Sequence, residues 1–252
     1  MKGFQTKLDV IGNNIANVNT IGYKKSTINF QDLLSQNLSG SGVNPMQVGL
    51  GSTTSAINVI HTPGSSMTTG VGTDLAIMGD GFFVVQDPDA ANGTADGRFL
   101  TRAGNFILNS DKQLVTSQGY NVLDTAGNKI TIPDGYESFT INRQGELIGK
   151  LANGTEDPNP IATITTSSPE NPAGLRKFGG SLYEMTDAAG GWNLSVDAAG
   201  NPEIGTGMLE MSNVDLTEEF TEMIIAQRGF QANSRTITTS DEILQEVVNL
   251  KR

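Results

Sequence analysis

Asn213-Val-Asp-Leu-Thr-Glu-Glu-Phe220 opens a stretch that runs on to Leu250 without a proline, and this stretch decides the fold. An apolar residue occupies every seventh position: Leu216, Met223, Phe230, Ile237 and Leu244. A second, partly apolar seam starts at Phe220 and ends at Val248. This repeat is typical of a helix that packs along another helix. It predicts a helix of roughly 50 Å, which is too long for one small domain to cover alone.

The ends of this stretch favour a helix, but its middle does not. Asp215 is a natural N-cap, and Glu218 stands where its side chain can reach back to the cap. The basic pair at 251–252 suits the negative end of the helix dipole. Gly229 and the Ser and Thr residues of 234–240 are poor helix formers, each unfavourable by up to ~1 kcal/mol relative to alanine. The helix therefore needs a partner, either its own domain or other helices, and this stretch alone favours neither.

The N-terminal segment repeats the same spacing. Its apolar residues lie 4, 3, 4 and 3 positions apart on one helix face: Phe4, Leu8, Ile11, Ile15 and Val18. The asparagines between positions 13 and 19 compete with the helical backbone for hydrogen bonds, so this helix also needs a partner. The first 30 residues carry a net charge of +3, and residues 208–252 carry −4. Matching seams and opposite charges predict that the two ends pair, within one chain or between copies.

The composition excludes several classes of function. A net charge of −11 argues against nucleic acid and anionic membranes as partners. The chain has no cysteine, which excludes disulfides, thiolate chemistry and cysteine-ligated metals. The first residues lack the apolar core of a signal peptide, and no apolar run approaches the ~20 residues that span a bilayer.

Between residues 75 and 207 the pattern changes to short apolar strands separated by turn residues. Leu75–Met78 and Phe82–Val85 flank Gly79-Asp-Gly81, which predicts a β-hairpin. Similar strand pairs flank the turn residues at 109–112, 124–128 and 143–145. Thirty glycines in the chain agree with a turn-rich β protein, and we expect one antiparallel β domain here.

The predicted fold class is therefore mainly β with helical ends. A central antiparallel β domain is flanked by N- and C-terminal α-helices that pair as a coiled coil in an assembly. The predicted division is a helical segment at 1–30, an extended Gly/Ser/Thr-rich connector at 31–72, the β domain at 73–207 and the long helix at 208–252.

Nothing in the sequence supports an enzyme. His61, the only histidine, lies beside Pro63 and is more typical of an ordinary loop residue than of a catalyst. Gly79-Asp-Gly81 lacks the lysine of a phosphate loop. The side chains of Asp87, Asp89, Asn92 and Asp96 lack EF-hand spacing, and we expect a solvated loop. No catalytic, cofactor-binding or metal site is predicted, and no cofactor is expected.

Both ends and the middle of the chain carry a specific resemblance. The motifs are Asp9-Val-Ile-Gly-Asn-Asn-Ile-Ala-Asn-Val-Asn-Thr-Ile-Gly-Tyr-Lys24, Leu75-Ala-Ile-Met-Gly-Asp-Gly-Phe-Phe-Val84, Thr101-Arg-Ala-Gly-Asn-Phe106 with Leu114-Val-Thr-Ser-Gln-Gly119, Gly207-Met-Leu-Glu-Met-Ser-Asn-Val-Asp215 and Ala226-Gln-Arg-Gly-Phe-Gln-Ala-Asn-Ser234. They resemble the motifs of the bacterial flagellar axial family, which contains rod and hook subunits. The resemblance spans nearly the whole chain and is poorest from about 161 to 203.

The resemblance implies a structural subunit that polymerises into a hollow tube, with the terminal helices inside and the β domains outside. Ile225–Asn233 and Thr238–Leu244 look more like the hook protein, which implies a curved tube that transmits torque as a universal joint between rod and filament. The alternative is the distal rod, a straight drive shaft. Members usually have a short apolar stretch before the position of Met1, so the first helix is expected to lack its first residues here.

The implied partners are other copies of the chain, other axial proteins of the rod, the hook–filament junction and the hook cap, and the flagellar export apparatus. Neither nucleic acid nor a membrane is an expected partner. The implied location is the extracellular flagellum, in the hook or the basal body, after type III export without a cleaved signal peptide. Subunit packing is assigned to Phe4, Leu8, Ile11, Ile15, Leu216, Phe220, Met223, Phe230, Ile237, Leu244 and Val248.

Overall fold

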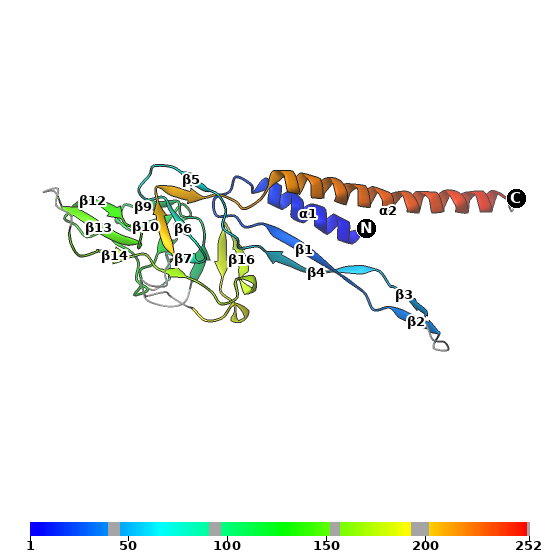
Figure 1. The fold of residues 1–252 in the computed structure, drawn as a ribbon, viewed down its shortest axis with the longest axis horizontal. Helices are drawn as coiled ribbons and strands as arrows, with labels where there is room; N and C mark the ends of the chain where they lie inside the picture. The colour runs from blue at the N-terminus through cyan, green and yellow to red at the C-terminus, as the bar shows by residue number, and fades with distance from the viewer. Residues whose placement is uncertain (40–45, 91–96, 152–156, 193–201, 251–252) are drawn as a thin grey trace. The chain divides into compact units, whose positions relative to one another are not determined.

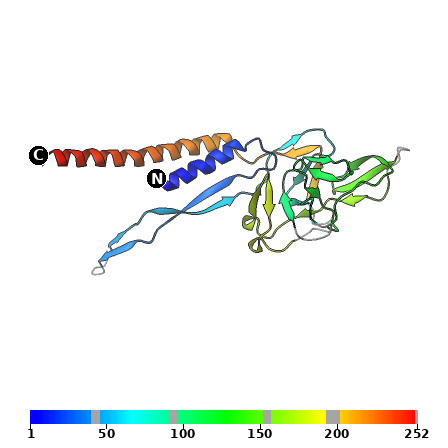
Figure 2. The same cartoon turned by 180° about the vertical axis from the view of Figure 1, so that it is seen from behind.

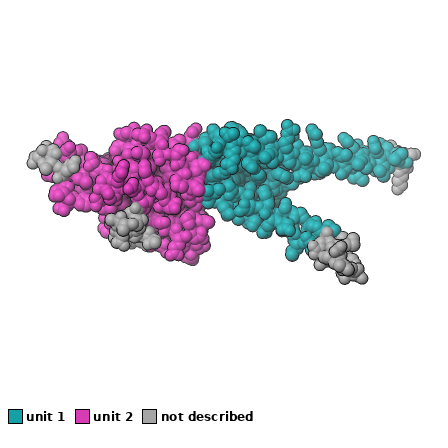
Figure 3. Space-filling model, viewed as in Figure 1, with its two compact units in different colours: residues 1–18, 25–60, 214–252 teal, residues 19–24, 61–213 magenta. Residues whose placement is uncertain are grey.

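The computed structural model describes residues 1–39, 46–90, 97–151, 157–192 and 202–250 (Figure 1). The chain forms two compact units, which Figure 3 shows in different colours. Unit 1 contains residues 1–18, 25–60 and 214–252, and unit 2 contains residues 19–24 and 61–213. The polypeptide therefore passes four times between the units.

Two antiparallel helices dominate unit 1. They are α1 (Lys2–Ala16) and α2 (Leu216–Leu250), and α1 lies alongside the first half of α2 in both views (Figures 1 and 2). The seven-residue seam thus forms one continuous helix of 35 residues, in spite of Gly229 and the Ser and Thr residues of its middle. Tertiary contacts over the first half of α2 supply the stability that the local sequence lacks.

A long β-hairpin completes unit 1. β1 (Ser26–Asp32) pairs antiparallel with β4 (Ser52–Val59), with a bulge between Asn29 and Phe30. β2 (Gln36–Ser39) and β3 (Met46–Val48) pair in the same way further along the hairpin. The start of β1 follows α1 closely in sequence and contacts it, so the hairpin brings backbone groups to the side of the helix.

Unit 2 is built from antiparallel sheets. Among the described residues its largest sheet has eight strands in the order β16 (Arg176–Gly179), β17 (Leu182–Glu184), β8 (Arg98–Thr101), β7 (Phe82–Gln86), β11 (Asn121–Val122), β10 (Leu114–Thr116) and β9 (Phe106–Leu108), with β15 (Thr166–Ser167) also paired to β7. The smaller sheets are β12 (Tyr136–Ile141), β13 (Glu146–Leu151) and β14 (Ala162–Thr163); β18 (Glu203–Thr206) with β6 (Leu75–Met78); and β19 (Met208–Glu210) with β5 (Ser66–Thr68). The described part of the unit also contains the short 3-10 helices η1 (Pro172–Gly174) and η2 (Asp187–Ala189).

The core of unit 2 is apolar and buried. Its members include Leu75, Phe83, Val85, Phe106, Leu114, Val122, Ile130, Leu147 and Ile164. The rings of Phe83 and Phe106 meet edge to face, with their centroids 5.2 Å apart. Antiparallel sheets in the middle of the chain and terminal helices that contact each other confirm the predicted fold class.

The predicted turns at 109–112, 124–128 and 143–145 all form; at 124–128 Leu123 bridges Lys129, and the Asn128 N–H donates to Asp124 Oδ1 at 2.8 Å. β9 and β10 flank Asn109–Lys112, where the Asn109 side-chain oxygen accepts bonds of 2.9 Å from the N–H groups of Asp111 and Gln113. β12 and β13 flank 143–145, and the side-chain oxygen of Asn142 accepts two backbone N–H groups in the same way. An asparagine that accepts bonds from residues two and four positions on replaces missing backbone partners in a tight turn.

The hairpin predicted around Gly79-Asp-Gly81 is wrong. β6 pairs with β18, whereas β7 pairs with β8, β11 and β15. The φ angles of Gly79 and Gly81 are +134° and +141°, far from the values near +60° that two-residue hairpin turns require. Both flanking strands are continuous apolar runs, the pattern of strands buried on both faces, and each takes its partners from elsewhere in the chain.

Some sequence-based predictions fall outside the described residues. They concern part of the connector (40–45), Asn92 and Asp96 of the acidic loop, two parts of the β domain (152–156 and 193–201), and the basic pair Lys251 and Arg252.

His61 has a packing role in unit 2. Its ring meets the rings of Phe82 and Tyr183 edge to face, at centroid distances of 5.4 and 5.3 Å. Burial, reinforced by the positive charges of Lys24, Arg102 and Lys177, lowers the pKa of His61 to about 4. The imidazole is therefore neutral at neutral pH and acts as one member of an aromatic cluster.

This lowered pKa predicts that unit 2 loses stability in mild acid. The unfolded chain takes up a proton on His61 below pH 6.5, whereas the folded chain does so only below about pH 4. The free energy of unfolding should therefore fall across that window, by about 2 kcal/mol once partial solvent screening is allowed for. Thermal melting of the chain at pH 7, 5.5 and 4.5 measures this loss.

His61→Phe is the matched control, because phenylalanine keeps the edge contacts with Phe82 and Tyr183 and cannot be protonated. The variant should melt at nearly the same temperature at pH 7 and 5.5. An equal loss in the variant and the parent would assign the effect to other groups.

Candidate subunit-packing surface on the terminal helices

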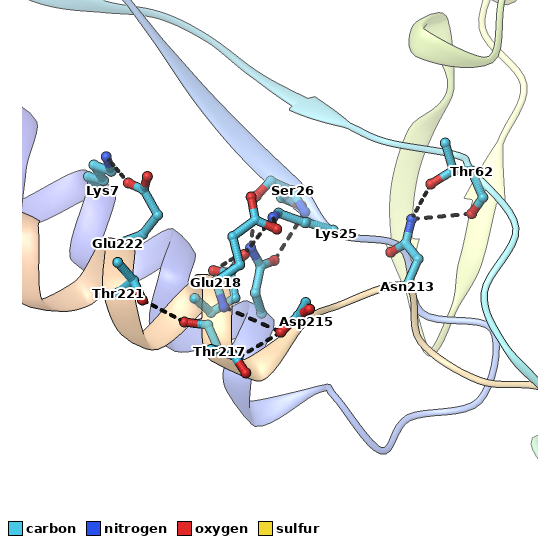
Figure 4. Close-up of polar contacts among 12 residues, drawn as sticks. Lys7, Lys25, Ser26, Thr62, Asn213, Asp215, Thr217, Glu218, Thr221 and Glu222 are labelled. Carbon is cyan, nitrogen blue, oxygen red and sulfur yellow. Dashed lines mark hydrogen bonds and ion pairs between the residues drawn. The ribbon is translucent and has the colours of Figure 1, made fainter.

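α2 begins at a side-chain cap. Asp215 accepts the N–H of Thr217 at 2.7 Å and that of Glu218 at 3.3 Å through the same carboxylate oxygen (Figure 4). These two bonds lower the pKa of Asp215 below its ordinary value. The predicted N-cap is thus correct. The carboxylate of Glu218, which was expected to reach back to the cap, instead forms an ion pair with Lys25, whose Nζ lies 2.9 Å from Oε2.

Asp215→Ala should shorten α2 at its N-terminal end. The first N–H groups of the helix lose their acceptor, so their amide hydrogen exchange should become faster while exchange near Ala226 changes little. Asp215→Asn is the control, because the amide oxygen still accepts these bonds. Since the folded pKa of Asp215 is lowered, its contribution is present above the unfolded value and is lost as the pH falls below about 4.

Close contact between the helices depends on Gly229. A Cβ atom there would lie 2.6 Å from Cε1 of Phe4, so any larger residue would push the Phe4 ring away from the backbone of α2. One turn nearer the cap, Ala226 is completely buried. The ammonium of Lys7 pairs with the carboxylate of Glu222 at the edge of this contact (Figure 4). Gly229, which weakens the helix in isolation, is therefore explained by the helix pairing.

A buried polar cluster joins both helices to β1. The side-chain amide of Asn14 donates to the Ser26 carbonyl at 2.9 Å, and its oxygen accepts the Ser26 N–H at 3.0 Å. The same amide nitrogen donates to Oε2 of Glu219 at 3.2 Å. Lys25 Nζ lies 3.0 Å from Oε1 of Glu219, so both oxygens of this buried carboxylate are satisfied.

The charges of this cluster stabilise one another. Burial alone would lower the pKa of Lys25, but the hydrogen bonds and charges of Glu218 and Glu219 together raise it above its ordinary value. Lys25 therefore stays protonated throughout the neutral range. A buried carboxylate that binds a cation and a side-chain amide favours the one arrangement of α1, α2 and β1 in which all three groups are paired. Any other arrangement, or removal of one partner, leaves a buried polar group unsatisfied.

The structure divides the predicted packing residues into two groups. Ile11 is buried, and Phe4, Leu8, Ile15, Met223 and Phe230 are half-buried in the α1–α2 pair or beside it. The others are exposed: Leu216 (40%), Phe220 (50%), Ile237 (59%), Leu244 (63%) and Val248 (67%). From residue 235 to residue 250 every side chain of α2 is exposed. Among the residues that the structure describes, none therefore covers the second half of the seam.

Sequence reasoning missed the polar residues that fix this pair. Asn14 is one of the asparagines that were expected only to weaken the helix, and no role was predicted for Glu219. One signal was present: Asn14 lies three positions after Ile11 and four before Val18, a spacing that places it on the buried face of α1. The partner of such a residue lies about 200 positions away and has no local signature.

Within the described part of the chain, no helix is both long enough and apolar enough to cross a membrane. Nor do three acidic or histidine side chains converge as metal ligands would among those same residues.

Comparison with known proteins covers the whole chain. Three family models match: "Flagella basal body rod protein" at residues 1–24, "Flagellar hook protein FlgE/F/G D1 domain" at 76–149 and "Flagellar basal body rod FlgEFG protein C-terminal" at 206–250. The flagellar basal-body rod protein FlgG of Bacillus subtilis is 49% identical, over 100% of this chain and 96% of its own length. The protein of the same name from Agrobacterium fabrum is 39% identical, with the same coverage. The flagellar hook protein FlgE of Borreliella burgdorferi is 27% identical over 100% of this chain and 97% of its own length.

Proposed function

Because the chain belongs to the flagellar rod and hook FlgE/F/G family of non-enzymatic axial proteins, we propose that it is the subunit of the distal rod of the flagellar basal body. In this role the chain polymerises with other copies of itself and with other axial proteins into a straight tube that carries torque. The α1–α2 pair forms the inner wall of that tube, as a coiled coil with neighbouring copies.

The uncovered second half of α2 carries this proposal. Its apolar seam continues through Ile237 and Leu244 at the same seven-residue spacing as the covered half, and Val248 ends the second seam. These side chains are 59–67% exposed, and the described α1 (Lys2–Ala16) lies along the first half of α2. A contiguous apolar stripe on a soluble helix marks a protein interface. In the assembled rod we expect neighbouring copies to cover Leu216, Phe220, Ile237, Leu244 and Val248.

The comparisons support the rod over the hook, which the motifs near the C-terminus favoured in the sequence analysis. Identity to the rod protein of Bacillus subtilis is 49%, against 27% to the hook protein of Borreliella burgdorferi. The alignment with the rod protein spans 267 positions, close to the length of this chain, whereas that with the hook protein spans 439. The chain thus lacks the additional length of that hook relative.

Export of the chain through the flagellar type III apparatus, without a cleaved signal, is part of the same proposal. In the basal body its neighbours are the other rod proteins below and the hook above. The hook–filament junction and the hook cap, which the hook interpretation implied, are then not direct neighbours.

Replacement of chromosomal genes in the native host separates rod from hook. Deletion of the gene for this chain should abolish hooks and filaments together, because the hook has no rod on which to grow, and a plasmid copy should restore both. Purified basal bodies from such cells should carry the chain in a straight segment below the hook. Deletion that leaves complete rods and removes only the hook would assign the chain to the hook instead.

A further inference from the structure

The points where the polypeptide leaves unit 2 are bound to one another inside that unit. The chain leaves or enters unit 2 next to residues 19, 24, 61 and 213. The N–H of Gly22 donates to the backbone carbonyl of Glu210 at 2.8 Å, and the N–H of Gly64 donates to Oε1 of Glu210 at 2.9 Å. The side-chain amide of Asn213 donates to the carbonyl of Thr62 at 3.2 Å. Hydrogen bonds therefore connect the three segments of unit 2 at which the chain enters or leaves it, near residues 22, 62–64 and 210–213.

A buried group of three charges lies at the centre of these bonds. The side chains of Lys24, Arg102 and Glu210 are 0%, 1% and 3% exposed. Lys24 pairs with Oε1 of Glu210, and Arg102 Nη1 lies 3.2 Å from Oε2, so each carboxylate oxygen has its own cation. Lys24 Nζ also donates to the carbonyl of Thr62 at 2.7 Å. One carboxylate thus holds the segments at 24, 62–64 and 210 together.

The segment before Lys24 is held from both sides as well. Lys177 Nζ donates to the carbonyl of Lys24 at 3.2 Å and lies 4.6 Å from the centre of the Tyr23 ring. The Ser181 hydroxyl donates to the carbonyl of Ile21 at 3.2 Å. A Cβ at Gly22 would lie 2.5 Å from the backbone nitrogen of Ala103, so this segment lies directly on the strand end that carries Arg102.

Burial of these charges requires a reason other than stability. Desolvation of ions generally offsets the attraction between them, and apolar residues of similar volume often give an equally stable core. Desolvation also lowers the pKa of Lys24, which shows that burial opposes its charge. A buried ion cluster does, however, hold the connected segments in one relative position, because any displacement of one segment leaves a buried charge unpaired.

We propose that Lys24, Arg102 and Glu210 form a torque-transmitting joint, which fixes the ends of the chain crossings on unit 2 so that torque enters the β unit through them. This proposal rests on the proposed function, since it concerns torque within an axial subunit. The three residues come from motifs that are far apart in sequence, at Gly22-Tyr-Lys24, Thr101-Arg102 and Glu210. The joint is a positioning device, and it borders the apolar interior, since the Arg102 guanidinium lies 5.1 Å from the centre of the buried Phe82 ring.

Glu210→Gln tests the joint, with Glu203→Gln as the matched control. Glutamine removes the charge that Lys24 and Arg102 share, whereas Glu203 is exposed at the start of β18. In the purified full-length chain, amide exchange at Gly22 and Gly64 should become at least tenfold faster in Glu210→Gln and change less than twofold in the control. Exchange at Leu114, whose N–H donates to Ile130 within the β unit, should stay the same.

A second variant guards against a general folding defect. Lys177→Met removes a bond to the Lys24 carbonyl without leaving a buried carboxylate unpaired. It should accelerate exchange at Gly22 about threefold and leave Gly64 unchanged. Protection of Gly22 and Gly64 at the parent level in both variants would overturn the joint.

The function of the joint is measured in cells of the native host. Cells with Glu210→Gln should keep a normal number of filaments but lose more than half of their swimming speed in viscous medium, relative to dilute medium, while Glu203→Gln cells match the parent. A loss of filaments in proportion to the loss of motility would indicate a folding role and contradict the joint. Failure of the parent gene itself to restore motility to the deleted strain would count against the proposed function instead.

Discussion

Glu219→Leu should lower the free energy of unfolding of the helix pair by about 3 kcal/mol, since removal of one partner leaves buried polar groups unsatisfied. Glu219 is 2% exposed, and its two oxygens bind Asn14 and Lys25. Leucine has similar bulk but satisfies neither group, and the Asn14 amide is itself buried. Hydrogen exchange of α1 in the full-length chain measures the effect, and a stability loss of this size corresponds to more than a hundredfold acceleration.

Glu222→Leu is the control for this prediction. Glu222 lies one turn further along α2 and pairs with Lys7, but its side chain is 41% exposed. Exposed ion pairs contribute less than about 1 kcal/mol, so exchange of α1 should change only a few-fold. Equal effects from the two leucine variants would show that α1 is held by general charge attraction and not by the buried cluster.

Gly104→Ala should destabilise unit 2 by about 3 kcal/mol or more, because the new methyl group meets backbone and not a movable side chain. A Cβ at Gly104 would lie 1.7 Å from the carbonyl oxygen of Leu75 and 2.7 Å from its carbonyl carbon. The same two residues are bonded through the Leu75 N–H and the Gly104 carbonyl at 3.0 Å, so the strands cannot separate without loss of that bond. The melting temperature of unit 2 should fall by about 10 °C.

Gly72→Ala is the matched control within the same unit. A Cβ at Gly72 meets no atom within 4 Å, and its backbone is not in the positive-φ region. This variant should melt within about 2 °C of the parent, because loss of chain entropy in the unfolded state is its main effect. A Gly104→Ala variant as stable as Gly72→Ala would mean that β6 and the segment after β8 are not in the contact described here.

The helices of this protein could be predicted from sequence because their signal is periodic and local. Leu216, Met223, Phe230, Ile237 and Leu244 mark one face by spacing alone, and that spacing continues through Gly229 without a break. The turns at Asn109–Lys112 and after Asn142 were predictable for the same reason, since one asparagine supplies the bonds that close each turn.

Which strands pair, and which polar side chains bind each other, could not be predicted, because the partners lie far apart in the chain. β6 and β7 are neighbours in sequence, yet β6 pairs with β18, whose first residue is Glu203. Lys24 and Glu210 are 186 positions apart, and neither has a local pattern that names the other. Asn14 is polar, so a hydrophobic pattern excludes it, although it bonds the residue that starts β1.

The central claim is that copies of the chain cover the second half of α2, and hydrogen exchange of residues 235–250 tests it most directly. In the free chain, at concentrations too low for assembly, these amides should exchange much faster than those of the first half of α2, which α1 covers. In the assembled tube the same amides should be protected at least a hundredfold more strongly. Protection of 235–250 in the dilute free chain, or equally fast exchange in the tube, would contradict the account.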